Sequence, residues 1–145
     1  LTSIRQPVFL LLPVVTAIAS ILAGLGAAAL WGPSMGDGAA VAGGFGWYSL
    51  SAVLIADAGK EVLGATAFLA NLFRESLAIL TIGFLQAAGK PLSGISAAGA
   101  TSMDVCLPPI ALSHGGVYTT PSVYHGFVLS MMVPLVVPLF LAFSA

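Results

Sequence analysis

The chain alternates long apolar runs with short polar or glycine- and proline-rich stretches. Each apolar run is at least as long as the roughly 20 residues that a helix needs to cross the hydrocarbon core of a bilayer. This pattern predicts an all-α integral membrane protein with one transmembrane domain over residues 1–145. Its five transmembrane segments are expected at residues 7–31, 36–58, 61–88, 92–112 and 117–144.

The second and fourth segments contain residues that are unfavourable in a continuous helix. Glycines flank Phe45 within residues 43–46, and each costs about 1 kcal/mol relative to alanine in a helix interior. Either the helix unwinds there or the glycines let a neighbouring backbone approach closely. In residues 99–109 a glycine, hydroxyls, a carboxylate and prolines interrupt the apolar run. We therefore predict that both segments are broken or re-entrant.

The interruption at residues 99–109 is the strongest candidate for a binding site. Non-helical backbone at membrane depth is tolerated only where protein buries it or where it lines a cavity. An ionisable residue there, in this case Asp104, is a functional-site candidate. A half-helix that starts near Thr101 and Ser102 would present free N–H groups and a positive dipole end. The alternative is that Asp104 serves only as the N-cap of that half-helix.

The third segment places polar side chains near its centre. Asn71 and Glu75 are i,i+4 neighbours on one helix face, and Arg74 points about 100° away. One interpretation is a buried Arg–Glu or Arg–Asp network that only holds helices together. A functional role is favoured because charges at membrane depth are costly and rare.

The first and last segments are less informative. Small residues share one face of the first segment and are expected to let another helix pack closely; they are Ala17, Ser20, Gly24 and Ala28. The first segment is also too long for the about 7–15 apolar residues of a signal peptide, which indicates a retained helix. His114 is predicted to be a solvated loop residue. His125 lies in the last segment, where a lone histidine is more often structural than a ligand.

Composition excludes several classes of protein. The chain is 59% hydrophobic and 6% charged, whereas soluble domains are roughly a quarter charged, so the lipid bilayer is its expected solvent. A net charge of -1 offers no basic patch for nucleic acid. The single cysteine excludes an internal disulfide and a cysteine-rich metal site. His114 and His125 lack metal-ligand spacing, so no metal, cofactor or enzymatic activity is expected.

Interrupted membrane segments are the best sequence indication of a transporter binding site, which commonly lies between two inverted repeats. The five segments resemble one repeat unit, and no second copy is evident within the chain. The other half would then be another chain, a second copy of this chain, or part of a longer gene product. If every segment crosses the membrane, Arg5, Lys60 and residues 113–116 lie on one side and Lys90 on the other.

Four motifs together resemble the C-terminal half of the LysO-type lysine exporters, over residues from about 40 to the end. They are residues 44–51, 74–75, 99–104 and 125–127. The resemblance implies a multi-pass exporter of L-lysine, and of close cationic analogues, in the inner (plasma) membrane. It implies a distant likeness to the bile-acid-symporter and cation/proton-antiporter folds, and an N-terminal half-transporter as partner. Glu75 and Asp104 correspond to intramembrane acidic residues of the family.

The chemistry of these residues agrees with a small cationic substrate. Arg74 can neutralise at most one of the carboxylates of Asp104 and Glu75. A lysine side chain or a proton would neutralise the other, because an isolated buried carboxylate tends to take up a proton. Competition between the two provides a basis for antiport. The substrate carboxylate would suit a half-helix N-terminus. The remaining candidate binding residues are Tyr48, Ser49, Asn71, Thr101, Ser102 and His125.

Other functions stay open at this point. The chain could be a membrane scaffold or assembly subunit whose charges only fix helix register, or a transporter of another small solute or ion. An ion channel is a further alternative, although no filter motif that could form a ring is present.

Overall fold

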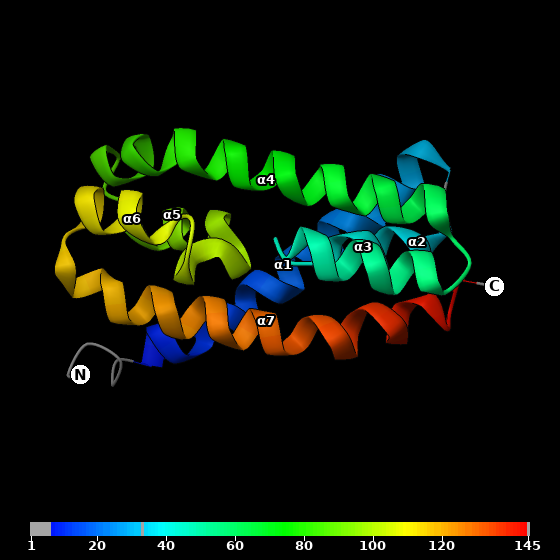
Figure 1. Ribbon diagram of the computed structural model, residues 1–145. Helices are drawn as coiled ribbons and strands as arrows, with labels where there is room; N and C mark the ends of the chain where they lie inside the picture. The colour runs from blue at the N-terminus through cyan, green and yellow to red at the C-terminus, as the bar shows by residue number, and fades with distance from the viewer. Residues whose placement is uncertain (1–6, 33, 145) are drawn as a thin grey trace.

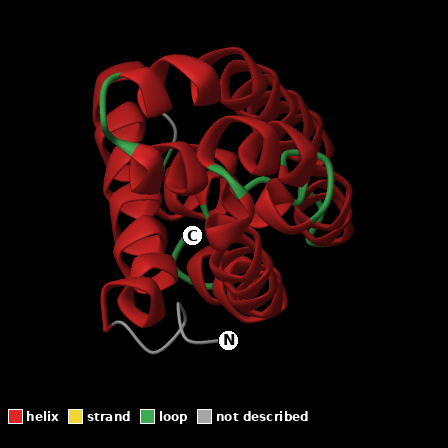
Figure 2. Ribbon diagram, turned by 90° about the vertical axis from the view of Figure 1, so that its left-hand side faces the viewer, coloured by secondary structure: helices red, strands yellow, loops and turns green. Residues whose placement is uncertain are grey.

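The computed structural model describes residues 7–32 and 34–144 and is built from helices and connecting loops over these residues (Figures 1 and 2). The prediction of an all-α fold is therefore confirmed. The elements are α1 (Pro7–Trp31), α2 (Met35–Ala42), α3 (Tyr48–Asp57), α4 (Glu61–Ala87), α5 (Pro91–Ala98), the 3-10 helix η2 (Gly99–Met103), α6 (Leu107–His114), the 3-10 helix η3 (Gly116–Tyr118) and α7 (Thr119–Leu141).

Three helices are long and apolar enough to cross a membrane. They are α1, α4 and the continuous stretch of η3 and α7, with 25, 27 and 26 residues. At 1.5 Å per residue each is about 37–40 Å long, which exceeds the roughly 30 Å of the hydrocarbon core. The described residues therefore confirm a helical chain with three membrane-capable helices. The other two expected segments are each divided into short helices.

The second segment folds back on itself. We call α2, α3 and the turn between them hairpin 1 (residues 35–57). Figure 1 shows both of its ends at the end of the bundle where α4 begins. Lys60, just after α3, donates from Nζ to Oδ1 of Asp37 in the first turn of α2 at 2.6 Å. With 8 and 10 residues, the two arms are about 12 and 15 Å long, so each reaches only halfway through the bundle.

The fourth segment forms a second hairpin at the opposite end of the bundle (Figure 1). We call α5, η2 and α6, residues 91–114, hairpin 2. Its two arms lie side by side: a Cβ atom added to Gly94 in α5 would lie 2.6 Å from Nε2 of His114 at the end of α6. The two hairpins enter from opposite ends, and their tips meet near the middle of the bundle.

This arrangement corrects the predicted sides of the loops. Lys90 precedes hairpin 2 and residues 113–116 follow it, so both lie at one end, while Lys60 lies at the other (Figure 1). The prediction that Lys60 shares a side with residues 113–116 is wrong, because each hairpin returns to the end from which it starts. Arg5 lies outside the described residues.

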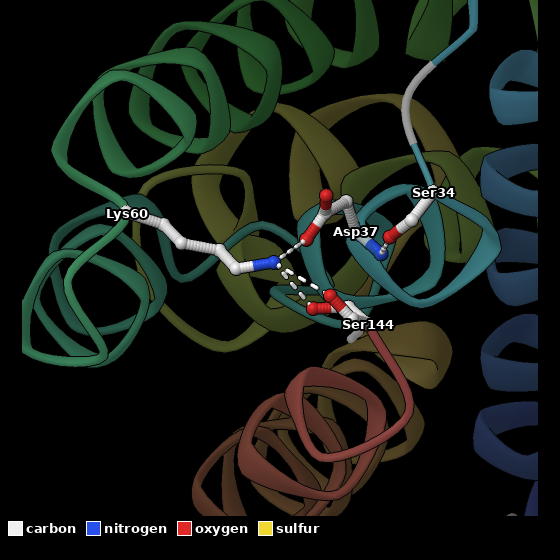
Figure 3. Close-up of polar contacts among 4 residues, drawn as sticks. All are labelled: Ser34, Asp37, Lys60 and Ser144. Carbon is white, nitrogen blue, oxygen red and sulfur yellow. Dashed lines mark hydrogen bonds and ion pairs between the residues drawn. The ribbon is translucent and has the colours of Figure 1, made fainter.

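The base of hairpin 1 is tied to the end of the chain. Lys60 Nζ also donates to the Ser144 carbonyl O at 3.1 Å and to its hydroxyl, and the Asp37 backbone N–H donates to Ser34 Oγ at 3.1 Å. Figure 3 shows Asp37 and Ser144 at the ammonium group of Lys60, with Ser34 next to the backbone nitrogen of Asp37. The cluster therefore joins the start of α2, the α3–α4 turn and the residues after α7.

Small residues set the distance between α1 and hairpin 1. This agrees with the prediction that the small residues on one face of the first segment let another helix pack closely. A Cβ atom added to Gly24 of α1 would overlap the carbonyl O of Gly38 in α2 and lie 2.5 Å from the Cβ atom of Ala42. The two backbones are thus too close for any larger side chain. The main apolar cluster lies beside this contact and joins hairpin 1 to α7 through Phe45, Ile55, Leu129 and Val133.

We predict that Gly24→Ala lowers the free energy of unfolding by about 1–3 kcal/mol, because the added methyl group has no space without a backbone shift. Gly26→Ala is the matched control in the same helix, since nothing lies within 4 Å of the Cβ atom it adds. Its stability should be unchanged or rise by up to about 1 kcal/mol. Denaturant titration in detergent, followed by circular dichroism, measures both. Equal losses would contradict the close contact between α1 and α2.

Candidate functional site

The tips of the two hairpins are joined by a backbone hydrogen bond. The N–H of Ala100 donates to the carbonyl O of Phe45 at 2.8 Å. Phe45, Gly46 and Gly99 have positive φ angles of 49, 106 and 64°. At Gly99 a Cβ atom would overlap the Phe45 carbonyl O and the Arg74 guanidinium, so only glycine fits. Both predicted interruptions are confirmed. At residues 43–46 the helix unwinds and a neighbouring backbone also approaches closely, so both alternatives given for this stretch hold.

A cavity of about 220 Å³ lies between the two tips, and we call it the tip cavity. Hairpin 1, hairpin 2 and α7 all contribute to its wall. Its lining residues are Gly46, Trp47, Tyr48, Ser49, Ala100, Thr101, Met103, Asp104, Val105 and Ser130. The structure therefore brings together four of the predicted binding residues, which are Tyr48, Ser49, Thr101 and Asp104.

Asp104 supplies the carboxylate of the tip cavity. Its side chain is exposed, and Oδ1 accepts a local hydrogen bond from the N–H of Val105 at 2.6 Å. Helix α6 begins only at Leu107, and its N-cap residue is Cys106. The interpretation of Asp104 as the N-cap of a half-helix is therefore wrong, because the unwound stretch extends past it.

The helix N-terminus at the tip cavity belongs to α3. This helix begins at Tyr48, and the preceding residue Trp47 makes no side-chain capping bond. The first N–H groups of a helix lack intrahelical partners and carry a partial positive charge. We had expected this feature in the fourth segment, but α6 begins with Leu107 followed by two prolines, which have no N–H. The wall of the cavity thus contains both a carboxylate and an uncapped helix start.

Glu75 lies outside the lining of the tip cavity. Its side chain on α4 is 8% exposed, and Oε2 is buried without a hydrogen-bond partner among the described residues. A buried unpaired carboxylate oxygen costs free energy unless a proton or a cation compensates for it. Glu75 is therefore the buried acidic group of this region, whereas Asp104 is the accessible one.

Asn71 supports the broken backbone of hairpin 1. Its Oδ1 accepts from the N–H of Gly46 at 2.8 Å, and its Nδ2 donates to the carbonyl groups of Val41 at 3.3 Å and Ala67 at 2.9 Å. Asn71 is 4% exposed and does not line the tip cavity. The structure gives it the role of satisfying backbone groups that unwinding leaves free.

Arg74 performs the same task for hairpin 2. Its Nε donates to the carbonyl O of Ala97 at 3.1 Å and its Nη2 donates to that of Ser96 at 3.0 Å. Both carbonyl groups lie near the C-terminal end of α5, where a positive charge is favourable. No carboxylate of the described residues lies within 4.0 Å of Arg74. The alternative interpretation, a buried Arg–Glu or Arg–Asp network, is therefore not formed within the described residues.

Ser102 and His125 belong to a buried chain of hydrogen bonds. Ser102 Oγ lies 3.0 Å from His125 Nδ1 and donates to the carbonyl O of Ser122 at 2.9 Å. His125 Nε2 lies 3.0 Å from Thr16 Oγ1, which donates to Ser96 Oγ at 2.9 Å. This series of hydrogen bonds joins α1, hairpin 2 and α7. Both Ser102 and His125 are 0% exposed, so neither reaches the tip cavity.

The prediction of a solvated His114 is wrong. Its side chain is only 7% exposed, and its ring packs edge-to-face against Tyr118 at a centroid distance of 5.8 Å. The reason is the fold of hairpin 2, which brings Gly94 of α5 against the imidazole ring. A position next to two glycines in the sequence gives no indication of this contact.

Sequence reasoning missed several residues of this region. Trp47 lines the tip cavity and stands inside the motif at residues 44–51, so that motif was sufficient to include it. Ser130 also lines the cavity, and Thr16 bonds to His125. Neither has a local signal, because each is recognisable only by its contacts with distant segments.

Three long apolar helices around two unwound hairpins define an α-helical membrane protein built on discontinuous helices. Residues 3–141 match the family model described as lysine exporter LysO. The chain belongs to the lysine exporter LysO family, which is a family of transporters rather than enzymes. The resemblance of the sequence motifs to this family is confirmed.

Two relatives illustrate the relationship. The lysine exporter LysO of Escherichia coli (strain K12) is 35% identical over 134 residues, which is 92% of this chain and 44% of that protein. A Haemophilus influenzae (strain Rd) protein provisionally named a lysine exporter is 31% identical over 135 residues, which is 92% of this chain and 68% of that protein. The chain thus spans less than half of the first relative. No solved structure matches.

We predict that His125→Phe destabilises the fold by about 1–3 kcal/mol, because it leaves the buried hydroxyls of Ser102 and Thr16 without one partner each. Ser76→Ala is the control, since the exposed Ser76 hydroxyl bonds only to its own helix at the Leu72 carbonyl O; its effect should be within about 0.5 kcal/mol. Hydrogen–deuterium exchange should show faster exchange in residues 99–106 of His125→Phe. Unchanged exchange would contradict the supporting role.

Proposed function

We propose that this chain forms the substrate-binding portion of a multi-pass transporter that exports L-lysine from the cytoplasm across the inner membrane. The observation that carries the proposal is the tip cavity, which is lined both by Asp104 and by the uncapped start of α3. Lysine offers the matching groups, an ammonium and a carboxylate. The name of the family and the names of both relatives support lysine as the substrate.

The two ends of the substrate would bind opposite walls of the tip cavity. The α-carboxylate suits the first N–H groups of α3, as anions do at helix N-termini. An ammonium group suits Asp104, and the face of Trp47 adds a cation–π contact. The hydroxyls of Ser49 and Ser130 supply further hydrogen bonds, whereas the Thr101 hydroxyl already donates to the carbonyl O of Ala98 at 2.8 Å and can only accept. Close cationic analogues of lysine present the same groups and are expected substrates.

The hairpins are proposed to be re-entrant, with α1, α4 and α7 as the crossing helices. Figure 1 supports this arrangement, because α1 and α4 run in opposite directions and each is followed by a hairpin at the end that it reaches. We propose that the unit of a helix plus a hairpin is an inverted repeat inside the chain, instead of the whole chain being one repeat unit. Inverted repeats with unwound helices at mid-membrane are typical of secondary transporters.

Export would be coupled to a cation such as H⁺ through the two carboxylates. Glu75 is buried with an unpaired oxygen, and such a group tends to take up a proton. Asp104 is accessible and is the better partner for the ammonium group. Because two negative charges close together disfavour each other, binding of the cationic substrate and protonation would influence one another. The complementary portion of the transporter completes the pathway.

Asp104→Asn should reduce saturable lysine exchange by about 10–100-fold, because a hydrogen bond to a charged group contributes about 1.5–3 kcal/mol. Radiolabelled-lysine counterflow in proteoliposomes containing the complete transporter measures the exchange. Asp57→Asn is the matched control at the exposed end of α3 and should leave exchange unchanged. Full exchange in Asp104→Asn would overturn the proposed site.

Glu75→Gln should uncouple transport from the proton gradient while lysine counterflow persists, because the substituted amide cannot take up or release a proton. Lysine flux driven by an imposed pH gradient, compared with counterflow at equal pH, separates the two steps. The control is Glu61→Gln in the exposed first turn of α4. If Glu75→Gln and Asp104→Asn both lower assembly and leave coupling intact, the scaffold alternative holds instead.

A further inference from the structure

A second cavity shares no lining residue with the tip cavity and has no role in the proposed transport step. It has a volume of about 470 Å³ and runs between α1, α2 and α4; we call it the α1–α4 groove. Its walls are mostly small residues. Gly24, Gly38 and Ala42 form the contact between α1 and α2, and Ala23, Ala27 and Ala70 also line the groove. Small residues let the backbone of another helix approach closely, so the groove has the surface of a helix-packing site.

One cation reaches this apolar groove. Arg74 lines it together with Asn71, and two of the guanidinium N–H groups are used by the carbonyls of Ser96 and Ala97. The other N–H donors have no hydrogen-bond partner among the described residues. All five acidic side chains of the chain lie in the described part, and none is within 4.0 Å of Arg74.

An arginine in a membrane segment is costly unless it is paired. Apart from Arg74, the polar residues that line the groove are Ser20, Thr66 and Asn71. The Thr66 hydroxyl donates to the carbonyl O of Val62, and the Asn71 amide is satisfied by the backbone of its own chain. Two carbonyl groups at the end of α5 already pair with the guanidinium, and its remaining N–H donors favour an occupant of the groove that brings a carboxylate to Arg74.

We propose that the α1–α4 groove receives one transmembrane helix of the complementary portion of the transporter, and that an Asp or Glu side chain near the middle of that helix pairs with Arg74. This inference rests on the proposed function for the existence of that portion. The partial coverage of a relative supports the existence of a complementary portion, since the match covers only 44% of the Escherichia coli relative.

Other occupants fit the groove less well. A lipid tail matches its apolar walls and brings no carboxylate to Arg74. A second copy of this chain has Glu75 and Asp104 as its acidic groups away from the ends of the long helices. Glu75 is 8% exposed, and Asp104 lies in the unwound backbone between η2 and α6 and not on a helix that could fill the groove. A helix from the complementary portion is therefore the occupant that the observations favour.

Site-directed photocrosslinking in native membranes tests the position of the partner helix. The complete transporter carries Cys106→Ser, and Ala27→Cys in the groove is labelled with benzophenone maleimide. Leu135→Cys, at a 73% exposed position of α7, is the control. We expect Ala27→Cys to crosslink to one transmembrane helix that contains an Asp or Glu, and the control to crosslink to lipid. Crosslinks from Ala27→Cys only to lipid, or only to a second copy of this chain, overturn the inference.

A charge exchange then tests the pairing. Changing the partner carboxylate to its amide should weaken assembly of the two portions by about 100-fold, as expected for the loss of one member of a buried ion pair. Arg74→Gln should cost the same amount, and the double variant should be no weaker than either single variant. Additive losses would contradict a direct pair.

The partner-side variant keeps the test valid if Arg74→Gln fails to fold, because it leaves the hydrogen bonds from Arg74 to hairpin 2 in place. Arg74→Lys should retain most of the assembly, since the charge is kept. The readout is assembly and not lysine flux. A crosslinked, charge-paired complex that moves no lysine would sustain this inference and overturn the proposed function.

Discussion

The hydrogen bond from the Ala100 N–H to the Phe45 carbonyl, 2.8 Å long, holds the centre of this structure together. It joins two stretches of backbone that have left the helix, and each comes from a different end of the bundle. Unwound backbone at membrane depth must find its partners inside the protein. Gly99 makes the contact possible because a side chain there would overlap both Phe45 and Arg74.

The same constraint explains the polar residues around the tips. Asn71 pairs with Gly46 and Val41 of hairpin 1, and Arg74 caps the end of α5 in hairpin 2. His125 links α1 and α7 to hairpin 2 through Thr16 and Ser102. Each of these groups satisfies others that would be costly if buried without partners. The side chains that remain available to a solute, Asp104 and the hydroxyls near it, are therefore those at the tip cavity.

This division of roles limits what the sequence could predict. The interruptions at residues 43–46 and 99–109 were predictable because glycine and proline act locally. Asp104 was predictable as well, since a carboxylate inside an apolar run needs a partner. Asn71, Arg74, Ser102 and His125 carry the same local signal, and only the long-range contacts distinguish supporting residues from lining residues. Ser130 and Thr16 had no local signal at all.

Whether the broken segments cross the membrane or fold back also could not be predicted from the local sequence. A segment such as residues 36–58 is long enough for one full crossing or for two half-crossings joined by a turn, and both use the same apolar composition. The contact between Lys60 and Asp37 decides between them, because it places both ends of hairpin 1 together. The end of the bundle at which each loop lies depends on whether the segment crosses or folds back. The prediction that Lys60 shares a side with residues 113–116 was therefore wrong.

The central claim is that the tip cavity binds lysine, and the fluorescence of Trp47 tests it most directly. Trp47 lines the cavity, whereas Trp31 lies at the end of α1 with 78% of its side chain exposed. In the complete transporter, with every other tryptophan replaced by phenylalanine, lysine should change the Trp47 emission saturably. Norleucine, which lacks the side-chain ammonium, should not. A folded protein whose Trp47 emission does not respond to lysine, or responds equally to norleucine, would contradict the account.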